Sequence, residues 1–323
     1  MTKVRDAQKS SYVPLTGGFG NQLFQIAFGV YLENQFGKKV VFDLNFGKPR
    51  KINNSVAVNG IQFQHSLNFL NQKSNKFHKF FAKSYSWNLV RSLDKKKNNK
   101  ISIPILKFLT SVLIQLKLKK RIKVISAKNL GFDVDLDLNE QAIYCGYFQT
   151  YIYASVPAVF DVLSNIRLPS FTKEYLDLQK QIEEKQPILL HVRLSDYLTE
   201  EQFGVPSLEY YEKAIEAVVK AKNCSTDIWV ISDDIQVAEV YLRELRIEHN
   251  LRFVNQEGLS DLEVWNLMRS FSGYIISNSS FAWWAAFLRK KIHAPVCAPV
   301  PWFQGMNDPE LLLPKDWIKV SSL

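Results

Sequence analysis

Residues 12–29, YVPLTGGFGNQLFQIAFG, carry the clearest fold signal in the chain. YVPLT predicts a short strand, and apolar residues then recur at helical spacing over residues 21–36, up to the stop signal Gly37. VVFDL, residues 40–44, predicts the next strand. A strand, a glycine loop, a helix and a second strand in this order predict the beginning of a parallel α/β sheet.

The second half of the chain repeats this alternation more regularly from Pro187 onward. Predicted strands cover residues 188–194, 227–233, 251–254, 273–277 and 296–300, and predicted helices cover 208–221, 236–248, 260–270 and 281–290. Strands that alternate with helices at this spacing are typical of a doubly wound parallel sheet. We therefore expect an α/β protein with two Rossmann-like domains that face each other across a cleft.

The expected N-terminal α/β domain covers residues 1–160, and the expected C-terminal domain covers residues 161–300. We expect residues 301–323 to pack back on the N-terminal domain. Within that domain FDVDLDLNE, residues 132–140, alternates with period two and predicts a half-exposed strand. Its aspartates lack the Gly and Glu that an EF-hand requires, so we expect no metal site there.

The composition is that of a globular protein, with 46% hydrophobic and 22% charged residues. The net charge of +10 is concentrated between Lys73 and Lys123, where fifteen Lys or Arg stand against the single acid Asp94. We therefore expect a basic insertion at 73–123. Anionic lipid headgroups are one candidate partner for it, and a solvated insertion without a partner is the alternative. Nucleic acid is not an expected partner, because no recognised nucleic-acid motif is present.

The N-terminal residues contain no apolar stretch of signal-peptide length before the first glycines. No window of the sequence approaches the roughly 20 uninterrupted apolar residues of a membrane span. Cys145, Cys224 and Cys297 are widely separated and fit a reducing compartment. We therefore expect a cytoplasmic protein. Peripheral contact with the inner face of the plasma membrane, through the basic insertion, is compatible with that expectation.

The glycine loop after the first predicted strand is a candidate anion site. Gly18 and Gly20 let a ligand approach the backbone closely, and the first N–H groups of the next helix favour negative charge. An NAD-binding fingerprint is the alternative, since Asp43 stands where a ribose-binding acid would be. Against this alternative, Leu23 occupies the third glycine position, and the pair Asn21–Gln22 has no role in it.

HVRLSDY, residues 191–197, ends the first predicted strand of the second half, where doubly wound sheets bind their ligands. Arg193 is a natural partner of pyrophosphate, because its guanidinium is always charged and can bind two oxygens at once. A structural ion pair between Arg193 and Asp196 is the alternative. His191 and Asp196 are the candidate general bases, and the sequence does not decide between them.

Two further predicted strands also end in polar residues. SDD, residues 232–234, could accept hydrogen bonds from a nucleoside or cap the following helix. In SNSSFAWWAAFL, residues 277–288, Ser279 and Ser280 stand at the start of an apolar helix, a position that suits phosphate. We expect the two tryptophans of this stretch to pack in the core.

Taken in this order, the motifs resemble those of the α-1,2-fucosyltransferases of glycosyltransferase family 11. The resemblance runs through GGFGNQLFQIAFG, GYFQT, HVRLSDY, VISDD, DLEVWNLM, SNSSFAWWAAFL and APVPWF, and it leaves out roughly residues 45–130. It implies a GT-B-like fold, GDP-fucose as donor, inversion at the anomeric carbon, and no required metal or cofactor. The implied acceptor is the 2-OH of galactose in a glycan, which in bacterial surface-polysaccharide synthesis could be lipid-linked.

By the same resemblance, Arg193 would hold the β-phosphate of the donor and Asp233 would contact the nucleoside. The residues implied to line the rest of the pyrophosphate site are Gly18, Gly20, Asn21, Ser279, Ser280 and Phe281. These groups would stabilise the charge that develops on GDP as an oxocarbenium-like sugar leaves it.

One departure from the family pattern concerns the position after Arg193. The family has a second Arg and a Gly where this chain has Leu194 and Ser195. A nucleotide- or glycan-binding protein that has lost turnover is therefore an alternative to the transferase, beside the NAD-dependent oxidoreductase.

Overall fold

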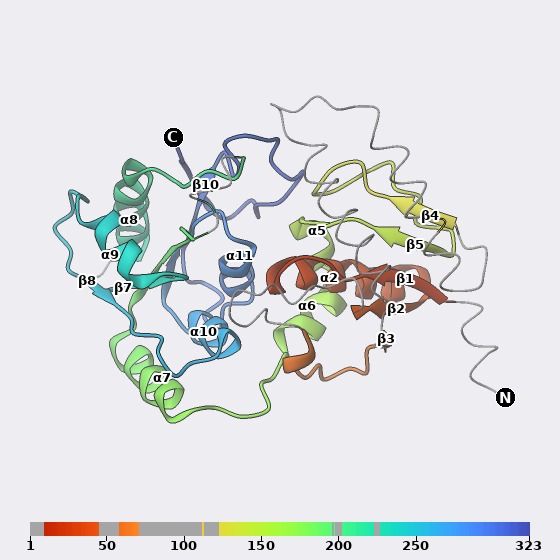
Figure 1. The fold of residues 1–323 in the computed structure, drawn as a ribbon, viewed down its shortest axis with the longest axis horizontal. Helices are drawn as coiled ribbons and strands as arrows, with labels where there is room; N and C mark the ends of the chain where they lie inside the picture. Colours follow the sequence, from red (N-terminus) through yellow and green to blue (C-terminus); the bar gives the residue numbers. More distant parts are fainter. Residues whose placement is uncertain are drawn as a thin grey trace. The chain divides into compact units, whose positions relative to one another are not determined.

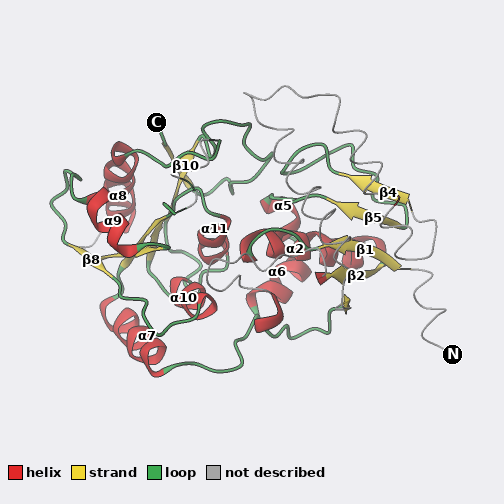
Figure 2. Cartoon of the chain, viewed as in Figure 1, coloured by secondary structure: helices red, strands yellow, loops and turns green. Residues whose placement is uncertain are grey.

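The computed structural model of the chain describes residues 10–44, 58–70, 112, 123–195, 197, 202–222 and 227–323. The chain divides into two compact units. Unit 1 comprises Met1–Arg167 with Asn307–Leu312, and unit 2 comprises Leu168–Met306 with Leu313–Leu323. Figure 1 follows the chain from red to blue, and Figure 2 distinguishes its helices, strands and loops.

Unit 1 is built on a parallel sheet. Its strands, in spatial order, are β3 (Phe69–Leu70), β2 (Lys39–Asp43), β1 (Ser10–Pro14), β5 (Ala142–Cys145) and β4 (Lys123–Ser126). All neighbouring strands are parallel. The helices described for this unit are α2 (Phe19–Phe36), α5 (Tyr151–Ala154) and α6 (Pro157–Ser164), with a 3-10 turn at Val58–Gly60.

Helix α2 is buried over most of its length, as its largely apolar sequence requires. It contacts strands β1 and β2 as well as helices α5 and α6. A Cβ at Gly29 would overlap the ring of Phe42 in β2, so glycine lets this helix approach the sheet closely. Gly37 ends the helix with a φ of 60°, the left-handed cap that the sequence predicts.

Unit 2 contains a second parallel sheet. Its strands, in spatial order, are β11 (Ile318–Ser321), β10 (Val296–Val300), β9 (Gly273–Ile275), β6 (Ile188–Val192), β7 (Ile228–Ser232) and β8 (Leu251–Phe253). Its helices are α7 (Lys173–Lys185), α8 (Leu208–Lys222), α9 (Ile235–Leu242), α10 (Asp261–Met268) and α11 (Ser280–Phe287). All neighbouring strands are parallel, which confirms the predicted α/β class.

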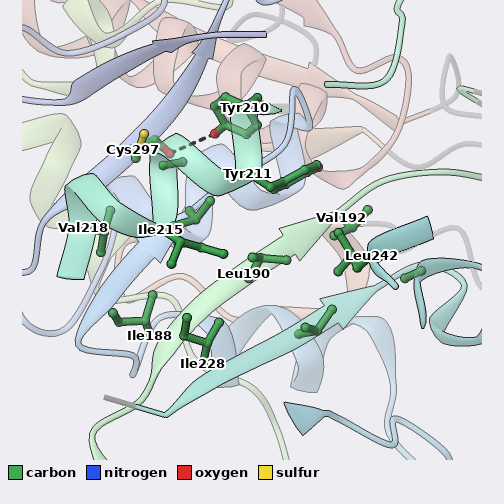
Figure 3. Close-up of a cluster of buried hydrophobic side chains, with 14 of the residues drawn as sticks. Ile188, Leu190, Val192, Tyr210, Tyr211, Ile215, Val218, Ile228, Leu242 and Cys297 are labelled. Atoms are coloured by element: carbon green, nitrogen blue, oxygen red, sulfur yellow. Dashed lines mark hydrogen bonds between the residues drawn. The ribbon is translucent and has the colours of Figure 1, made fainter. Parts of the chain in front are cut away.

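A hydrophobic core lies between this sheet and helices α8 and α9. Figure 3 shows Ile188 and Leu190 of β6 turned toward Ile215 and Val218 of α8, and all four are fully buried. Because side chains alternate along a strand, His191 points to the opposite face of the sheet.

Each sheet reverses its winding at one strand. In unit 1, β1 has β2 on one side and β5 on the other, and in unit 2, β6 has β7 on one side and β9 on the other. Doubly wound sheets bind ligands outside the carboxyl ends of their strands at such a reversal. We therefore expect ligand-binding residues directly after β1, β5, β6 and β9.

Residues 132–140 contain a turn at 134–135 and no strand, so the predicted strand is wrong. The Asp133 carboxylate accepts a hydrogen bond from the backbone N–H of Lys128 at 2.8 Å, and Asp137 accepts one from Asn139 at 3.1 Å. Aspartates that bind nearby backbone N–H groups stabilise turns in competition with strand pairing.

Helix α9 ends at Leu242, although the pattern predicts a helix over residues 236–248. The backbone N–H of Arg246 donates to the Glu212 carboxylate of α8 at 2.7 Å. The Arg246 N–H is thus bonded to a side chain, whereas a helix that continued to residue 248 would bond it to the carbonyl four residues earlier.

The C-terminal segment is shared between the units and does not pack as a whole on unit 1. Strand β11 pairs with β10 in unit 2, and its apolar side chains pack against the core of that unit. Only Asn307–Leu312 belongs to unit 1, which it meets at Gly131 and Tyr151. The units divide at Arg167 and Leu168, a few residues after the expected boundary at 160.

Candidate functional site

Arg193 directly follows β6, at the reversal of the unit 2 sheet. Its Nε atom lies 3.2 Å from Oδ2 of Asp233, which follows the neighbouring strand β7. The two side chains are 32% and 16% exposed, so the pair is partly shielded from water. Arg193 is therefore held in place while part of its side chain remains accessible.

Asp233 uses its carboxylate to hold the chain around Arg193. Oδ1 accepts from the backbone N–H of Leu194 at 3.0 Å, and Oδ2 accepts from that of Ser195 at 3.2 Å. Burial opposes the ionisation of Asp233, but the Arg193 charge and these two hydrogen bonds outweigh it and lower its pKa. The neighbouring Asp234 caps α9, one of the two roles that the sequence allowed for the SDD stretch.

Tyr197 connects Arg193 to the turn after β9. The guanidinium carbon of Arg193 lies 5.8 Å from the centre of the Tyr197 ring, and the Tyr197 hydroxyl donates to the carbonyl of Asn278 at 3.1 Å. The Asn278 amide donates in turn to the carbonyls of Phe203 and Gly204. Sequence reasoning missed Tyr197 and Asn278, because they act on backbone carbonyls that no motif reveals.

His191 bridges the two strands at the reversal. Its side chain is 4% exposed, and Nδ1 lies 2.9 Å from Oγ of Ser277, just after β9. Burial lowers its pKa to about 4, while Asp233 acts to raise it and Arg193 to lower it. A buried imidazole that already contacts Ser277 is poorly placed to take a proton from a substrate, so the geometry favours a structural bridge. Asp196, the other candidate base, lies outside the described residues.

The predicted phosphate-binding residues after β9 lie together at the start of α11. Ser279 is the N-cap residue of this helix, yet its side chain makes no capping hydrogen bond. Ser280 begins the helix, and both it and Phe281 are half-buried. The first N–H groups of a helix carry partial positive charge and can bind an anion. Trp283 and Trp284 are fully buried, which confirms that they pack in the core.

The other predicted residues surround the glycine loop of unit 1. Gly17 has a φ of +76°, and a Cβ there would lie 2.7 Å from Nδ2 of Asn21. Gly18 is the N-cap residue of α2, with φ −78° and ψ 178°, and a Cβ on it would meet no atom within 4 Å. Neither strain nor packing therefore requires glycine at Gly18, whereas open space at a helix N-terminus suits a ligand. Gly20 lies buried in the first turn of the helix.

Two buried glutamines hold this loop. The Gln25 amide accepts from the backbone N–H of Thr16 at 2.8 Å and donates to the Gly146 carbonyl at 3.0 Å, which joins the loop to the end of β5. Gln22 donates to the carbonyl of Gly17 at 3.0 Å. Sequence reasoning gave these amides no role, although both follow the glycines on α2.

A third glutamine reaches Asn21 from the other side of the reversal. Gln149, which lies between β5 and α5, donates from Nε2 to Oδ1 of Asn21 at 2.8 Å. The structure thus brings Gly18, Gly20 and Asn21 together in unit 1. In unit 2 it brings Arg193 into contact with Asp233 and places His191 beside Ser277, two residues before Ser279.

The NAD alternative loses support from the packing of α2. Leu23, at the third glycine position, is fully buried, and the close helix–sheet contact is made at Gly29 instead. Asp43 ends β2 as predicted, but its side chain is only 4% exposed. A ribose-binding acid would have to be accessible to its ligand.

The aspartates of residues 132–140 are engaged with the protein itself. Asp135 lies 2.7 Å from the Lys128 amine, and Asp137 lies 3.2 Å from that of Lys123. Across the part of the chain that the structure describes, no three His, Cys, Asp or Glu side chains form a group suited to a metal ion.

Among the described helices, none is long and apolar enough to cross a membrane. The expected basic insertion at 73–123 lies outside the described residues, apart from positions 112 and 123. Cys145 and Cys297 are both buried, and Cys224 is not among the described residues.

The sequence model of Glycosyl transferase family 11 matches residues 11–296. An alpha-1,2-colitosyltransferase of Escherichia coli is 22% identical, over 95% of this chain and 97% of its own. The O-antigen biosynthesis glycosyltransferase WbnK of Escherichia coli is 27% identical, over 96% of this chain and 100% of its own. A solved structure of the NodZ alpha-1,6-fucosyltransferase with GDP is 18% identical, with a TM-score of 0.45 over 87% of this chain and 93% of that one.

Proposed function

The chain belongs to glycosyl transferase family 11, and from this we propose that it transfers L-fucose from GDP-fucose to a glycan hydroxyl, with inversion at the anomeric carbon. The proposed acceptor is the 2-OH of galactose in a bacterial surface-polysaccharide precursor, which could be lipid-linked. Two relatives support this acceptor class by name, since one is an alpha-1,2-transferase and the other acts in O-antigen biosynthesis.

The observation that carries the proposal is the fixed position of Arg193 at the reversal of the unit 2 sheet. Asp233 holds its Nε atom, and the ring of Tyr197 lies beside its guanidinium. The start of α11 follows β9, the other neighbour of β6. A guanidinium and a helix N-terminus are the groups that proteins commonly use for phosphate, so this edge suits a nucleoside diphosphate.

In the proposed reaction the acceptor hydroxyl attacks C1 of fucose while the bond from C1 to the GDP oxygen breaks on the opposite face. Positive charge develops on the sugar and negative charge on the leaving diphosphate. Arg193 and the N–H groups at the start of α11 would stabilise the negative charge. No metal is required in this scheme, since these groups supply the positive charge. Asp196 is the better candidate to take the acceptor proton, because the His191 side chain is buried and already contacts Ser277.

A second donor follows from the name of one relative. Colitose is L-fucose without its 3-hydroxyl, and the relative is named as an alpha-1,2-colitosyltransferase. GDP-colitose and GDP-fucose carry the same diphosphate, so Arg193 would serve both. The donor preference must then come from contacts to the sugar.

The donor is tested by thermal stabilisation with GDP, GDP-fucose, GDP-colitose, GDP-mannose, UDP-galactose and NAD, without added metal. We expect GDP and GDP-fucose to raise Tm, and Arg193→Ala to abolish the shift. Arg243→Ala, at an exposed arginine just after α9, is the matched control and should keep it. Stabilisation by NAD alone, or by no guanosine nucleotide, would contradict the proposal.

Turnover separates the transferase from a binding protein. GDP release should depend on a galactose-terminated acceptor and should be the same with and without EDTA. NMR of the product gives the linkage and the anomeric configuration. Binding of GDP-fucose without transfer to any galactoside would favour the non-catalytic alternative, and a product of retained configuration would contradict inversion.

We also propose that the protein is cytoplasmic and contacts the membrane surface through the basic insertion. Lys and Arg outnumber acids by fifteen to one between Lys73 and Lys123, which suits anionic headgroups. The protein should pellet with phosphatidylglycerol vesicles at low salt and be released at high salt. Equal pelleting with neutral phosphatidylcholine vesicles would rule the electrostatic contact out.

A further inference from the structure

Gln149 lies at the reversal of the unit 1 sheet, and the proposed mechanism gives it no role. Its side chain is only 7% exposed. Nε2 donates to Oδ1 of Asn21, while Oε1 is buried without a hydrogen-bond partner among the described residues. Leaving a buried acceptor unpaired is costly. A glutamine kept in this state is expected to serve a ligand or a neighbouring side chain rather than stability.

The backbone around Gln149 is fixed by its surroundings. The preceding residue, Phe148, has a φ of 53°, which is unusual for a residue with a side chain. Its ring stacks on that of Phe28 with centroids 3.8 Å apart, and the Gln149 N–H donates to the carbonyl of Leu130 at 2.7 Å. A strained conformation persists where the structure holds it firmly, and such positions cluster at functional sites.

The hydrogen bond from Gln149 determines which end of the Asn21 amide faces outward. The acceptor end, Oδ1, is occupied by Gln149. The donor end, Nδ2, lies beside Gly17, where it would touch an added Cβ at 2.7 Å. No described group accepts a hydrogen bond from Nδ2. A donor is therefore presented next to Gly18, whose own Cβ position is open.

We propose that Gln149 is a positioning residue, which holds Asn21 so that Nδ2 donates to an oxygen of the bound substrate. This inference rests on the proposed function. The oxygen belongs either to a phosphate of the sugar nucleotide or to a sugar, since both accept hydrogen bonds. Gln149 itself acts through Asn21 and does not touch the reacting atoms.

Two substitutions at Gln149 separate orientation from packing. Gln149→Met keeps the size of the side chain and removes the hydrogen bond, so that Asn21 can rotate. Gln149→Glu places an acceptor there, so that Asn21 must turn Nδ2 inward and present Oδ1 to the substrate. We expect kcat/KM to fall about three- to tenfold in the first and about ten- to hundredfold in the second. Gln35→Met, the same change at an exposed position near the far end of α2, should leave kcat/KM unchanged.

A double-mutant cycle decides whether Gln149 works through Asn21. In an Asn21→Ala background, Gln149→Met should have no further effect on kcat/KM, because the group that it orients is gone. A structural role would lower Tm and reduce kcat/KM by the same factor in both backgrounds. That outcome overturns the proposal, as does full activity of Gln149→Met in the otherwise unchanged chain. The cycle uses only the methionine change, so it stands even if Gln149→Glu fails to fold.

Calorimetric titration with GDP identifies the oxygen. If Nδ2 binds phosphate, Gln149→Met weakens GDP binding, and if it binds a sugar oxygen, GDP binding is unchanged while transfer is slowed. Failure of the proposed function is distinguishable, because the unchanged chain would then neither bind GDP nor release it from any donor. Normal GDP binding and turnover together with a silent Gln149→Met would overturn the inference alone.

Discussion

Asp233→Asn tests whether Asp233 contacts the nucleoside, as the family resemblance implies, or positions Arg193, as the geometry indicates. The carboxylate accepts from Leu194 and Ser195 and pairs with Nε of Arg193. Asparagine keeps one acceptor oxygen and replaces the other by an NH2 group. That group would face N–H donors, so the substitution removes the attraction and leaves donors opposed to one another.

The loss of stability expected for Asp233→Asn depends on how exposed the Arg193–Asp233 pair is. Removing one partner of a fully buried pair costs about 3–5 kcal/mol, whereas surface pairs contribute about 0–1 kcal/mol. Arg193 is 32% exposed and can recover some hydration, so we expect the free energy of unfolding to fall by about 2 kcal/mol. For a domain of this size the fall in Tm is about 4–8 °C. We expect kcat/KM to fall about ten- to hundredfold, less than in Arg193→Ala, because the guanidinium is mobile rather than absent.

Inhibition by guanosine and by GDP distinguishes the two roles. Guanosine lacks the diphosphate, so a positioning role for Asp233 predicts that Asp233→Asn weakens GDP and leaves guanosine unchanged. Equal weakening of both would refute the positioning role and restore the nucleoside contact. Asp234→Asn is the matched control, since asparagine caps a helix about as well as aspartate.

Three further predictions concern Gly18, His191 and Leu194. Gly18→Ala should leave Tm within about 1 °C of its original value, since φ is −78° and the Cβ position is open. It should nevertheless weaken substrate binding. An unchanged KM would show that no ligand approaches Gly18. The native pKa of His191, about 4, lies below its usual 6.5, so the unfolded state binds more protons. The free energy of unfolding should therefore fall by up to about 3 kcal/mol as the pH is lowered from 6.5 to 4. Urea denaturation at both pH values should show a smaller fall for His191→Gln than for the unchanged protein. Leu194→Arg should lower Tm, because Leu194 is 1% exposed in the unit 2 core; a stable and more active variant would contradict this placement.

The fold could be predicted where burial makes the sequence periodic. Strands β6 and β7 and helix α8 fill the unit 2 core, so their patterns follow from what they pack against. Helix α7 was missed, because only Tyr175 and Ile182 are buried along it and its ends depend on caps. Strand β11 was missed because it is short and lies at the edge of the sheet, where pairing with β10 decides its conformation.

The site could be predicted as far as strand ends and glycine loops mark it. Arg193 follows β6, the strand at which the sheet reverses, and Ser279 comes after its neighbour β9; the alternation of strands and helices already suggests both positions. Their supports could not be predicted, because these depend on contacts between distant segments. Gln149 and Asn21, for example, are 128 positions apart in the chain. Whether His191 is exposed or buried likewise depends on which helix covers its face of the sheet.

The division of the C-terminal segment between the units matters for anyone recombining this chain with a relative. Residues 307–312 lie far along the chain from the rest of unit 1, yet Glu310 accepts from the Phe132 N–H at 2.9 Å and Leu311 accepts from that of Tyr151 at 3.0 Å. A Cβ at Gly131 would overlap the Glu310 backbone. A chimaera with a single crossover near residue 167 would inherit this patch from the wrong parent. A chimaera with two crossovers, in which residues 307–312 come from the same parent as unit 1, would keep these contacts between residues of one parent.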